Sequence, residues 1–201
     1  VVGEAINLLY DGMKKEELSL AILNATRTLI EQHYEYSSLA ARLLWDQVEQ
    51  EVSLALGETA KNSVEKELFP AYISKGISLE MLDPRMAEFD LKKLSDAIDP
   101  ERNNLFHYLG ARTIYDRYLL RTRERPQKAY EMPQWLWMRV AMGLSLNEEN
   151  REEKAIEFYN VLSQFYFISS TPTLFNSGTT HSQMSSCYLN TVDDSLTGIF
   201  K

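Results

Sequence analysis

The residues whose side chains could best bind a ligand or take part in a reaction lie between positions 168 and 200. This stretch offers several hydroxyl groups, a glycine turn at Gly178, a thiol at Cys187 and the pair Asp194-Ser195. Hydroxyls and backbone N–H groups in a loop can hold a phosphate or a ribose through short hydrogen bonds. The combination indicates a nucleotide site, although hydroxyl-rich loops mostly satisfy their own backbone. The clustered hydroxyl side chains are those of Ser169, Ser170, Thr171 and Thr173.

Cys187 has two interpretations. A lone cysteine in a short apolar stretch is usually a small buried hydrophobe. A redox role requires a polar microenvironment that supports the thiolate. Because the chain holds one cysteine, it cannot form an internal disulfide. A lone thiol suits a reducing compartment, which predicts a cytoplasmic protein.

The other candidate residues also have a structural alternative. Thr173 and Ser186 could contact a ligand or satisfy local backbone in a turn. Asp194 could cap a helix, and the same carboxylate could accept a hydrogen bond from a sugar hydroxyl. The histidines share no metal-ligand spacing, so the sequence predicts no metal site. They stand at His33, His107 and His181.

These candidates follow a long region with helical periodicity. Glycines 12 and 57 suit left-handed helix ends, and Asp83-Pro84 and Asp99-Pro100 are helix starts. The polar segment 122–130 reads as a loop. Helices are expected at 4–10, 16–33, 39–56, 84–98, 109–121, 133–146 and from 147 to about 167, with a weaker pattern over 61–76.

The pattern changes at Ile168. Residues 168–178 contain Pro and Gly among hydroxyls, which predicts a non-helical loop. Residues 184–190 read as a short strand, and Asp193-Asp194-Ser195 as the cap of another helix. In the helix expected from Pro133, Trp135 and Trp137 lie two positions apart, so at least one should face away from the deepest core.

Composition excludes several classes of protein. Hydrophobic residues make up 44% of the 201 residues, which is typical of a globular chain. The formal net charge of −8 disfavours general nucleic-acid binding. No apolar run approaches the roughly 20 residues that span a bilayer, so no membrane partner is expected. The chain begins without an initiator Met, which suggests trimming or a piece of something longer.

The order of motifs resembles one enzyme family. Residues 170–173 (STPT), 176–178 (NSG), 185–187 (SSC) and 193–196 (DDSL) are similar to the start of the catalytic barrel in large (alpha, catalytic) subunits of class I ribonucleotide reductases. Residues 10–12 (YDG) and 36–43 (YSSLAARL) resemble the back half of the ATP-cone found at the N-terminus of many of these subunits. The resemblance covers nearly the whole chain and identifies it as an N-terminal portion.

The resemblance implies a mainly α fold in three parts. Residues 1–56 would form a partial, degenerate ATP-cone, and residues 57–168 the helical N-terminal domain. Residues 169–201 would supply the first loop and strand of a ten-stranded α/β barrel. The front half of a cone is absent, and Glu49, Gln50 and Glu51 stand where basic residues are usual. Both departures argue against activity control by ATP through this copy.

The resemblance also implies a function, reduction of ribonucleoside diphosphates to 2′-deoxyribonucleotides for DNA replication. Cys187 would belong to the redox pair that reduces the ribose. Thr173, Ser185 and Ser186 would hold the substrate. An allosteric nucleoside triphosphate (a dNTP or ATP) would contact the start of the next helix. The residues implied for that contact are Asp194, Ser195 and Leu196.

The implied partners complete the enzyme, because the other catalytic residues would lie after Lys201 and this chain alone would not turn over. They are the rest of the large subunit, a thioredoxin or glutaredoxin type of reductant, and a small subunit whose metal generates the radical. The chain itself would bind no metal and would assemble as a homo-oligomer. The alternative is a non-enzymatic helical module for regulation or subunit assembly.

Overall fold

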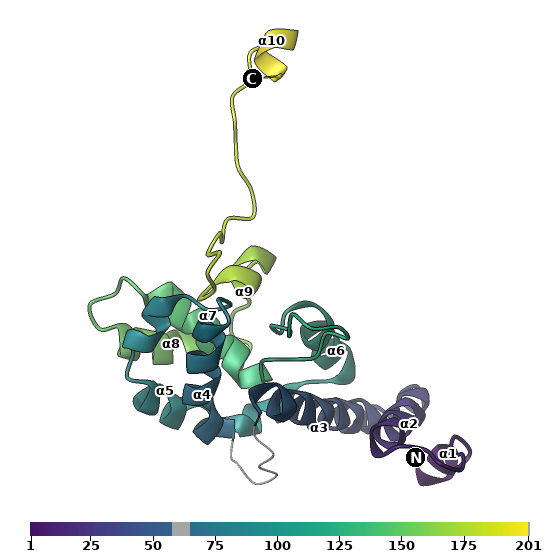
Figure 1. The fold of residues 1–201 in the computed structure, drawn as a ribbon. Coiled ribbons are helices and arrows are strands. Elements are labelled where there is room, and N and C mark those ends of the chain that lie inside the picture. The colour runs from purple at the N-terminus through teal and green to yellow at the C-terminus, as the bar shows by residue number, and fades with distance from the viewer. Residues whose placement is uncertain (58–64, 201) are drawn as a thin grey trace.

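The computed structural model describes residues 1–57 and 65–200 as a helical body with a long extended C-terminal segment (Figure 1). Lys61, where the weaker helical pattern begins, and Lys201 lie outside the described residues. The helices are α1 (Val2–Ile6), α2 (Lys15–Thr28), α3 (Glu35–Leu56), α4 (Glu65–Ser78), α5 (Leu91–Ala97), α6 (Tyr108–Arg117), α7 (Pro133–Ser145), α8 (Arg151–Ser163), α9 (Thr171–Asn176) and α10 (Leu196–Ile199), with two 3₁₀ helices, η1 (Pro84–Glu88) and η2 (Pro100–Leu105).

Several helix ends confirm the signals in the sequence. Gly57 ends α3 with φ of 78°, a left-handed conformation that glycine adopts without a Cβ penalty. Asp83 caps η1 by accepting a hydrogen bond from the backbone N–H of Arg85, and Asp99 does the same for Glu101 at η2. The helix predicted over 84–98 is instead two elements, because Asp90 caps a new helix, α5, by accepting from Lys93 N.

Helix α3 is the longest helix and connects the N-terminal helices to the body. It contacts both α2 and α6. Ser37 lies in the first turn of α3 and accepts a hydrogen bond from the backbone N–H of Tyr108 at 3.0 Å. The hydroxyl therefore caps the first turn of α6, which has no side-chain cap of its own.

Helix α4 contains Pro70 in its interior, where proline normally costs a backbone hydrogen bond. The carbonyl that loses its partner is that of Lys66, four residues earlier. The hydroxyl of Ser95, at α5, donates to this carbonyl. This contact from a neighbouring helix satisfies the carbonyl and stabilises α4 despite the proline.

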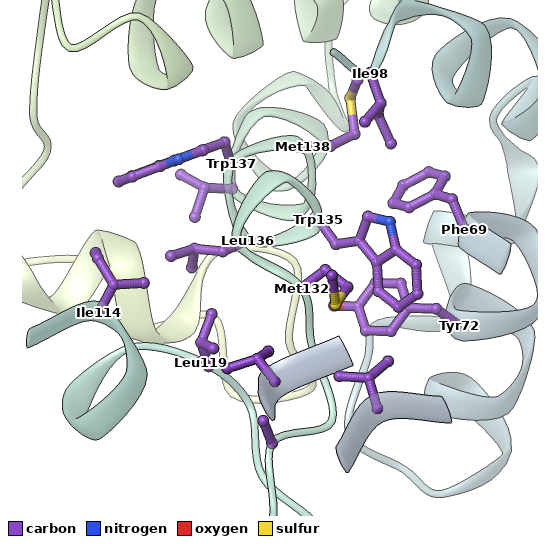
Figure 2. Packing of buried hydrophobic residues seen from close by; sticks show 14 of the residues in the cluster. Phe69, Tyr72, Ile98, Ile114, Leu119, Met132, Trp135, Leu136, Trp137 and Met138 are labelled. Atoms are coloured by element: carbon purple, nitrogen blue, oxygen red, sulfur yellow. The ribbon is translucent and has the colours of Figure 1, made fainter. Parts of the chain in front are cut away.

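Helix α7 lies at the centre of the core and is buried along nearly its whole length. Figure 2 shows Trp135 directed toward Phe69 and Tyr72 of α4, and the rings of Trp135 and Tyr72 stack with centroids 4.9 Å apart. Trp137 is also buried, at 1% exposure. Trp137 points to the opposite side of α7 from Trp135 (Figure 2), as the spacing predicts, but this second indole is also part of the core.

The last 30 residues differ most from the sequence predictions. The prediction of a non-helical loop over 168–178 is wrong, since α9 forms there with Pro172 in its first turn, where a missing N–H costs nothing. The strand predicted over 184–190 is not formed, and the described residues contain only two isolated β-bridges, both elsewhere. Residues 184–190 run as unpaired extended chain because no neighbouring strand offers them a ladder.

Candidate functional site

The hydroxyl groups at α9 contact the extended segment that follows it. Thr173 donates from Oγ1 to the backbone carbonyl of Met184 at 3.4 Å, and its hydroxyl lies 3.2 Å from that of Ser170. Asn176 donates from Nδ2 to the carbonyl of Gln183 at 2.6 Å. Two side chains of α9 therefore hold the backbone just before Ser185, so the helix and the start of the SSC motif are neighbours.

Ser185, Ser186 and Cys187 lie immediately beyond this attachment, and all three are exposed. The side-chain amide of Gln183 donates to the hydroxyl of Tyr188, which closes a short loop around them. The structure thus brings Thr173 beside the segment that carries the other substrate candidates. It does not enclose the thiol of Cys187, which faces solvent.

A buried ion pair anchors α9 to the centre of the core. Arg139 of α7 and Glu131, each 0% exposed, join Nε to Oε1 at 2.6 Å. The same guanidinium donates from Nη1 to the carbonyl of Ser177 at 2.7 Å and from Nη2 to that of Leu174 at 3.2 Å. These carbonyls are acceptors near the C-terminal end of α9, which its own helix leaves unpaired. Arg139 therefore fixes the helix that carries Thr173.

The charge of Arg139 is maintained by its contact with Glu131. Burial acts to lower the pKa of Arg139, but the charge and hydrogen bonds of Glu131 raise it on balance. Burial raises the pKa of Tyr72 well above its ordinary value, and the neighbouring Glu131 adds to this. Tyr72 therefore stays neutral and donates its proton to Oε1 of Glu131 at 2.5 Å. The hydrogen-bond network of Tyr72, Glu131 and Arg139 is therefore rigid, because its polar groups are paired with one another.

The backbone after α9 approaches α7 very closely. Ser177 donates from Oγ to the carbonyl of Val140 at 2.8 Å, and a Cβ built on Gly143 would lie 2.7 Å from the carbonyl carbon of Ser177. Gly178 has φ of 76°, the left-handed region that favours glycine. The glycine turn noted in the sequence is therefore a close contact between backbones.

Beside α9, a pocket of about 670 Å³ opens between α6, α7 and the hydroxyl residues. Ser169, Ser170 and Thr171 line one side, and Trp137 and Phe165 line another. The indole Nε1 of Trp137 is buried without a hydrogen-bond partner among the described residues. Thr173, Ser185, Ser186 and Cys187 do not line this pocket, so it adjoins the candidate substrate residues without including them.

The candidate effector residues form a separate group. Ser195 caps α10 by accepting a hydrogen bond from the backbone N–H of Gly198 at 3.1 Å, so the cap lies within the predicted group Asp193-Asp194-Ser195 but is Ser195 and not Asp194. Asp194 and Leu196 are exposed. Figure 1 shows α10 at the end of the extended segment, away from α9 and the helical body. The structure does not bring this group together with Thr173 or Cys187.

Sequence reasoning missed Arg139 and Glu131. The available signal was a lone arginine within an otherwise apolar helix, with an acid eight positions earlier. Among residues 1–57 and 65–200, no group of three or more His, Cys, Asp or Glu side chains is arranged to hold a metal ion. In the same residues, no helix is long and apolar enough to cross a membrane.

Comparison with known proteins identifies the class to which this helical body belongs. Residues 104–182 match the family model described as "Ribonucleotide reductase, all-alpha domain". This stretch contains α6, α7, α8 and α9, together with the Glu131–Arg139 pair.

Individual relatives extend the match over the whole chain. The chain is 43% identical over 196 residues to the "Ribonucleoside-diphosphate reductase subunit alpha" of Chlamydia trachomatis serovar D, covering 96% of this chain and 18% of that protein. It is 36% identical over 205 residues to the "Ribonucleoside-diphosphate reductase large subunit" of Plasmodium falciparum (isolate Dd2), covering 100% of this chain and 24% of that protein. The chain belongs to the family of ribonucleotide reductase large subunits, as an N-terminal portion, and spans about a fifth of the length of the bacterial relative.

Proposed function

We propose that this chain supplies the helical domain and the first active-site residues of a ribonucleoside-diphosphate reductase. Residues 1–56 would be a partial ATP-cone, 57–168 the helical domain, and 169–201 the beginning of the catalytic barrel. The single observation that carries the proposal is the bond from Thr173 to the carbonyl of Met184, which places a hydroxyl-bearing helix against the SSC motif. In the complete subunit, residues 184–190 would gain a neighbouring strand.

The reaction assigned to this site is a two-electron reduction. The C2′–OH bond of a ribonucleoside diphosphate breaks, the oxygen leaves as water, and a C2′–H bond forms. Two thiols supply the two electrons and the two hydrogens and become one disulfide. Cys187 would be one of these thiols, and its partner would lie in the rest of the large subunit. A separate small subunit with a metal cofactor would supply the radical that starts the reaction.

Substrate binding would use the two serines that precede the thiol in sequence and Thr173, whose hydroxyl contacts the backbone of Met184 just before them. Thr173, Ser185 and Ser186 can donate hydrogen bonds to phosphate or ribose oxygens. The support of Thr173 is rigid, since Arg139 holds α9 from within the core. Fixing a reductant beside a bound sugar supplies a large part of the rate advantage in reactions of this kind.

The remaining partners follow from the same proposal. Asp194, Ser195 and Leu196 would contact a nucleoside triphosphate effector once α10 packs against the rest of the subunit, in a homo-oligomer. A thioredoxin or glutaredoxin type of protein would reduce the disulfide after each turnover. The location expected for such an enzyme is the cytoplasm.

The test is a Cys187→Ser variant of this chain joined to the rest of the large subunit, assayed with the small subunit and a dithiol reductant. We expect multiple-turnover formation of deoxynucleotide to fall by at least about 100-fold, because the disulfide cannot form. The matched control is Ser182→Ala, an exposed serine on the same segment, which should retain activity. Full activity of the Cys187→Ser variant with dithiol electrons would show that the redox assignment is wrong.

A second variant, Thr173→Val, tests the substrate assignment separately. It removes the hydroxyl and keeps the side-chain shape, so we expect a raised KM with the fold retained. Unchanged kinetic constants in this variant would remove Thr173 from the substrate site. Unchanged activity in both the Cys187→Ser and the Thr173→Val variants would favour the non-enzymatic helical module.

A further inference from the structure

Positive charge is concentrated after the middle of α6, although the chain as a whole is acidic. Residues 112–128 hold six basic and two acidic side chains, a net charge of +4, whereas the whole chain carries −8. Much of this charge lies between α6 and α7, where the backbone folds back on itself at a bridge between Arg121 and Ala129. We call residues 121–129 the basic hairpin. The proposed reductase chemistry does not use it.

The cations at the tip of the basic hairpin have no acidic partner among residues 1–57 and 65–200. Arg123 donates to the backbone carbonyl of Glu80 at 3.3 Å, a neutral group that leaves the charge uncompensated. The side chains of Arg125 and Lys128 are exposed and contact no partner in this part of the chain. The local excess of positive charge is therefore available to a binding partner.

The backbone of the basic hairpin is held in place by hydrogen bonds. The N–H of Thr122 donates to the carbonyl of Lys128 at 2.9 Å, and the N–H of Lys128 donates to Oγ1 of Thr122 at 3.1 Å. Glu51 of α3 accepts from the N–H of Ala129 at 2.7 Å and from the hydroxyl of Tyr115 at 3.0 Å. A turn that is already ordered loses less conformational entropy when a partner binds to it.

A groove beside the basic hairpin adds an apolar surface. It has a volume of about 320 Å³ and lies between α2 and α3, and Lys128 is one of its lining residues. Leu20 of α2 and Leu54 of α3 also line it, and they are 48% and 64% exposed. Its two acids, Glu17 and Glu51, already accept hydrogen bonds within the chain. Apolar surface next to uncompensated cations fits a segment with both an apolar anchor and negative charge.

We propose that the basic hairpin and this groove form an interaction surface for an acidic polypeptide segment that carries apolar side chains at its centre. The apolar side chains of the partner contact Leu20 and Leu54, and its carboxylates pair with Arg123, Arg125 and Lys128. A nucleic acid is disfavoured, because the sequence outside residues 112–128 carries a net charge of −12 and repels an extended phosphate backbone.

The test is a fluorescence anisotropy titration of the 201-residue chain against a labelled peptide of about ten glutamates around a central pair of leucines. We expect saturable binding with a Kd below about 100 µM at about 50 mM salt, weakened at least about fivefold at about 500 mM salt. Two matched peptides separate the contributions. Glutamine in place of glutamate should weaken binding at least about tenfold, and alanine in place of the leucines at least about threefold.

Variants locate the surface. Arg125→Gln combined with Lys128→Gln removes two cations that hold no other part of the fold, and should weaken the peptide at least about tenfold. Lys92→Gln combined with Lys154→Gln is the control, because it removes the same charge from ion pairs on α5 and α8, and should bind as the parent chain does. Leu54→Gln should weaken binding several-fold by adding a polar group to the groove.

Four results would each overturn the proposal. They are the absence of saturation up to about 1 mM peptide, equal affinity for the glutamine peptide, unchanged binding in the Arg125→Gln, Lys128→Gln variant, and equal losses in that variant and its control. Tighter binding of a single-stranded oligonucleotide or of inorganic triphosphate than of the peptide would also overturn it, because the surface would then recognise phosphate and not a polypeptide.

Discussion

Arg139 donates a hydrogen bond from Nη1 to the backbone carbonyl of Ser177 at 2.7 Å, across 38 residues of sequence. The central helix of the core thereby holds the helix that carries the candidate substrate hydroxyl. A buried arginine serves this purpose well, because its planar fork bonds Glu131 and the two backbone carbonyls together. Glu131 compensates the charge of this arginine inside the core. Both the stability of the fold and the position of α9 therefore depend on the side chain of Arg139.

Arg139→Met tests this dependence. The change leaves Glu131 as an unpaired charge in a fully buried position, so we expect the free energy of unfolding to fall by ~3–5 kcal/mol. Urea denaturation of the 201-residue chain measures the difference. Lys154→Met removes the exposed contact to Glu157 and should change stability little. Similar losses in the two variants would contradict a special role for the buried pair.

Gly143→Ala tests the close approach of α7 to the backbone after α9. An added Cβ would overlap the backbone N of Gly178 and Oγ of Ser177, so we expect a loss of ~1–3 kcal/mol. The control is Gly110→Ala in α6, where the new Cβ meets only Cδ1 of Phe106 at 3.7 Å. There, higher helix propensity should stabilise the chain by up to ~1 kcal/mol. Opposite signs in thermal denaturation are the expected result.

Glu65→Gln should change how stability depends on pH. Burial raises the pKa of Glu65 from 4.5 to about 8, so between these values the folded chain holds a proton that the unfolded chain has lost. The free energy of unfolding therefore falls as pH rises through this window. The glutamine variant cannot ionise at this position. Its free energy of unfolding should therefore rise relative to that of the parent, by at most ~1.4 kcal/mol per pH unit. Urea denaturation at several pH values measures this gain.

Glu153→Gln provides a comparison of opposite sign. The hydrogen bond from Lys93 lowers the pKa of Glu153, so this carboxylate stabilises the fold above its ordinary pKa. That contribution disappears as pH falls through the lowered value. The glutamine variant should therefore lose stability relative to the parent as pH rises in the acid range. A flat difference for Glu65→Gln between pH 4.5 and 8 would argue that its carboxyl ionises normally.

The exposure of Cys187 predicts rapid labelling of the native chain. A disulfide reagent such as dithionitrobenzoate should modify one thiol per chain without denaturant, because the side chain lies on the surface. The rate should be similar in urea, where every thiol is accessible. Slow labelling that accelerates on unfolding would show that the thiol is buried in solution.

The sequence was sufficient at several helix ends that local chemistry decides, but not at residues 4–10, where α1 (Val2–Ile6) ends well before Gly12. The end of α3 at Gly57 and the caps at Asp83, Asp99 and Ser195 depend on one side chain and the adjacent backbone. The strand predicted over 184–190 did not form, since a strand needs a partner that these residues do not provide. No local sequence pattern predicts the contact between Arg139 and Ser177, because that contact depends on how two helices distant in the sequence pack together.

The candidate site shows the same division. Its hydroxyl and thiol residues were found from motif order, and the structure adds the bond that sets Thr173 beside Met184. The helix under that hydroxyl was missed, since Pro172 was read as a helix breaker although it stands in a first turn. Whether the thiol reaches a sugar depends on residues outside this chain, so that assignment stays a prediction.

The unpaired segment beyond Met184 also affects how the chain behaves in solution. Leu189 is 100% exposed and Phe200 85% exposed, on a backbone whose N–H and C=O groups have few partners of their own. Such an extended segment can pair through backbone hydrogen bonds with the same segment of another molecule when no native partner is present. Samples of this polypeptide should therefore associate as concentration rises.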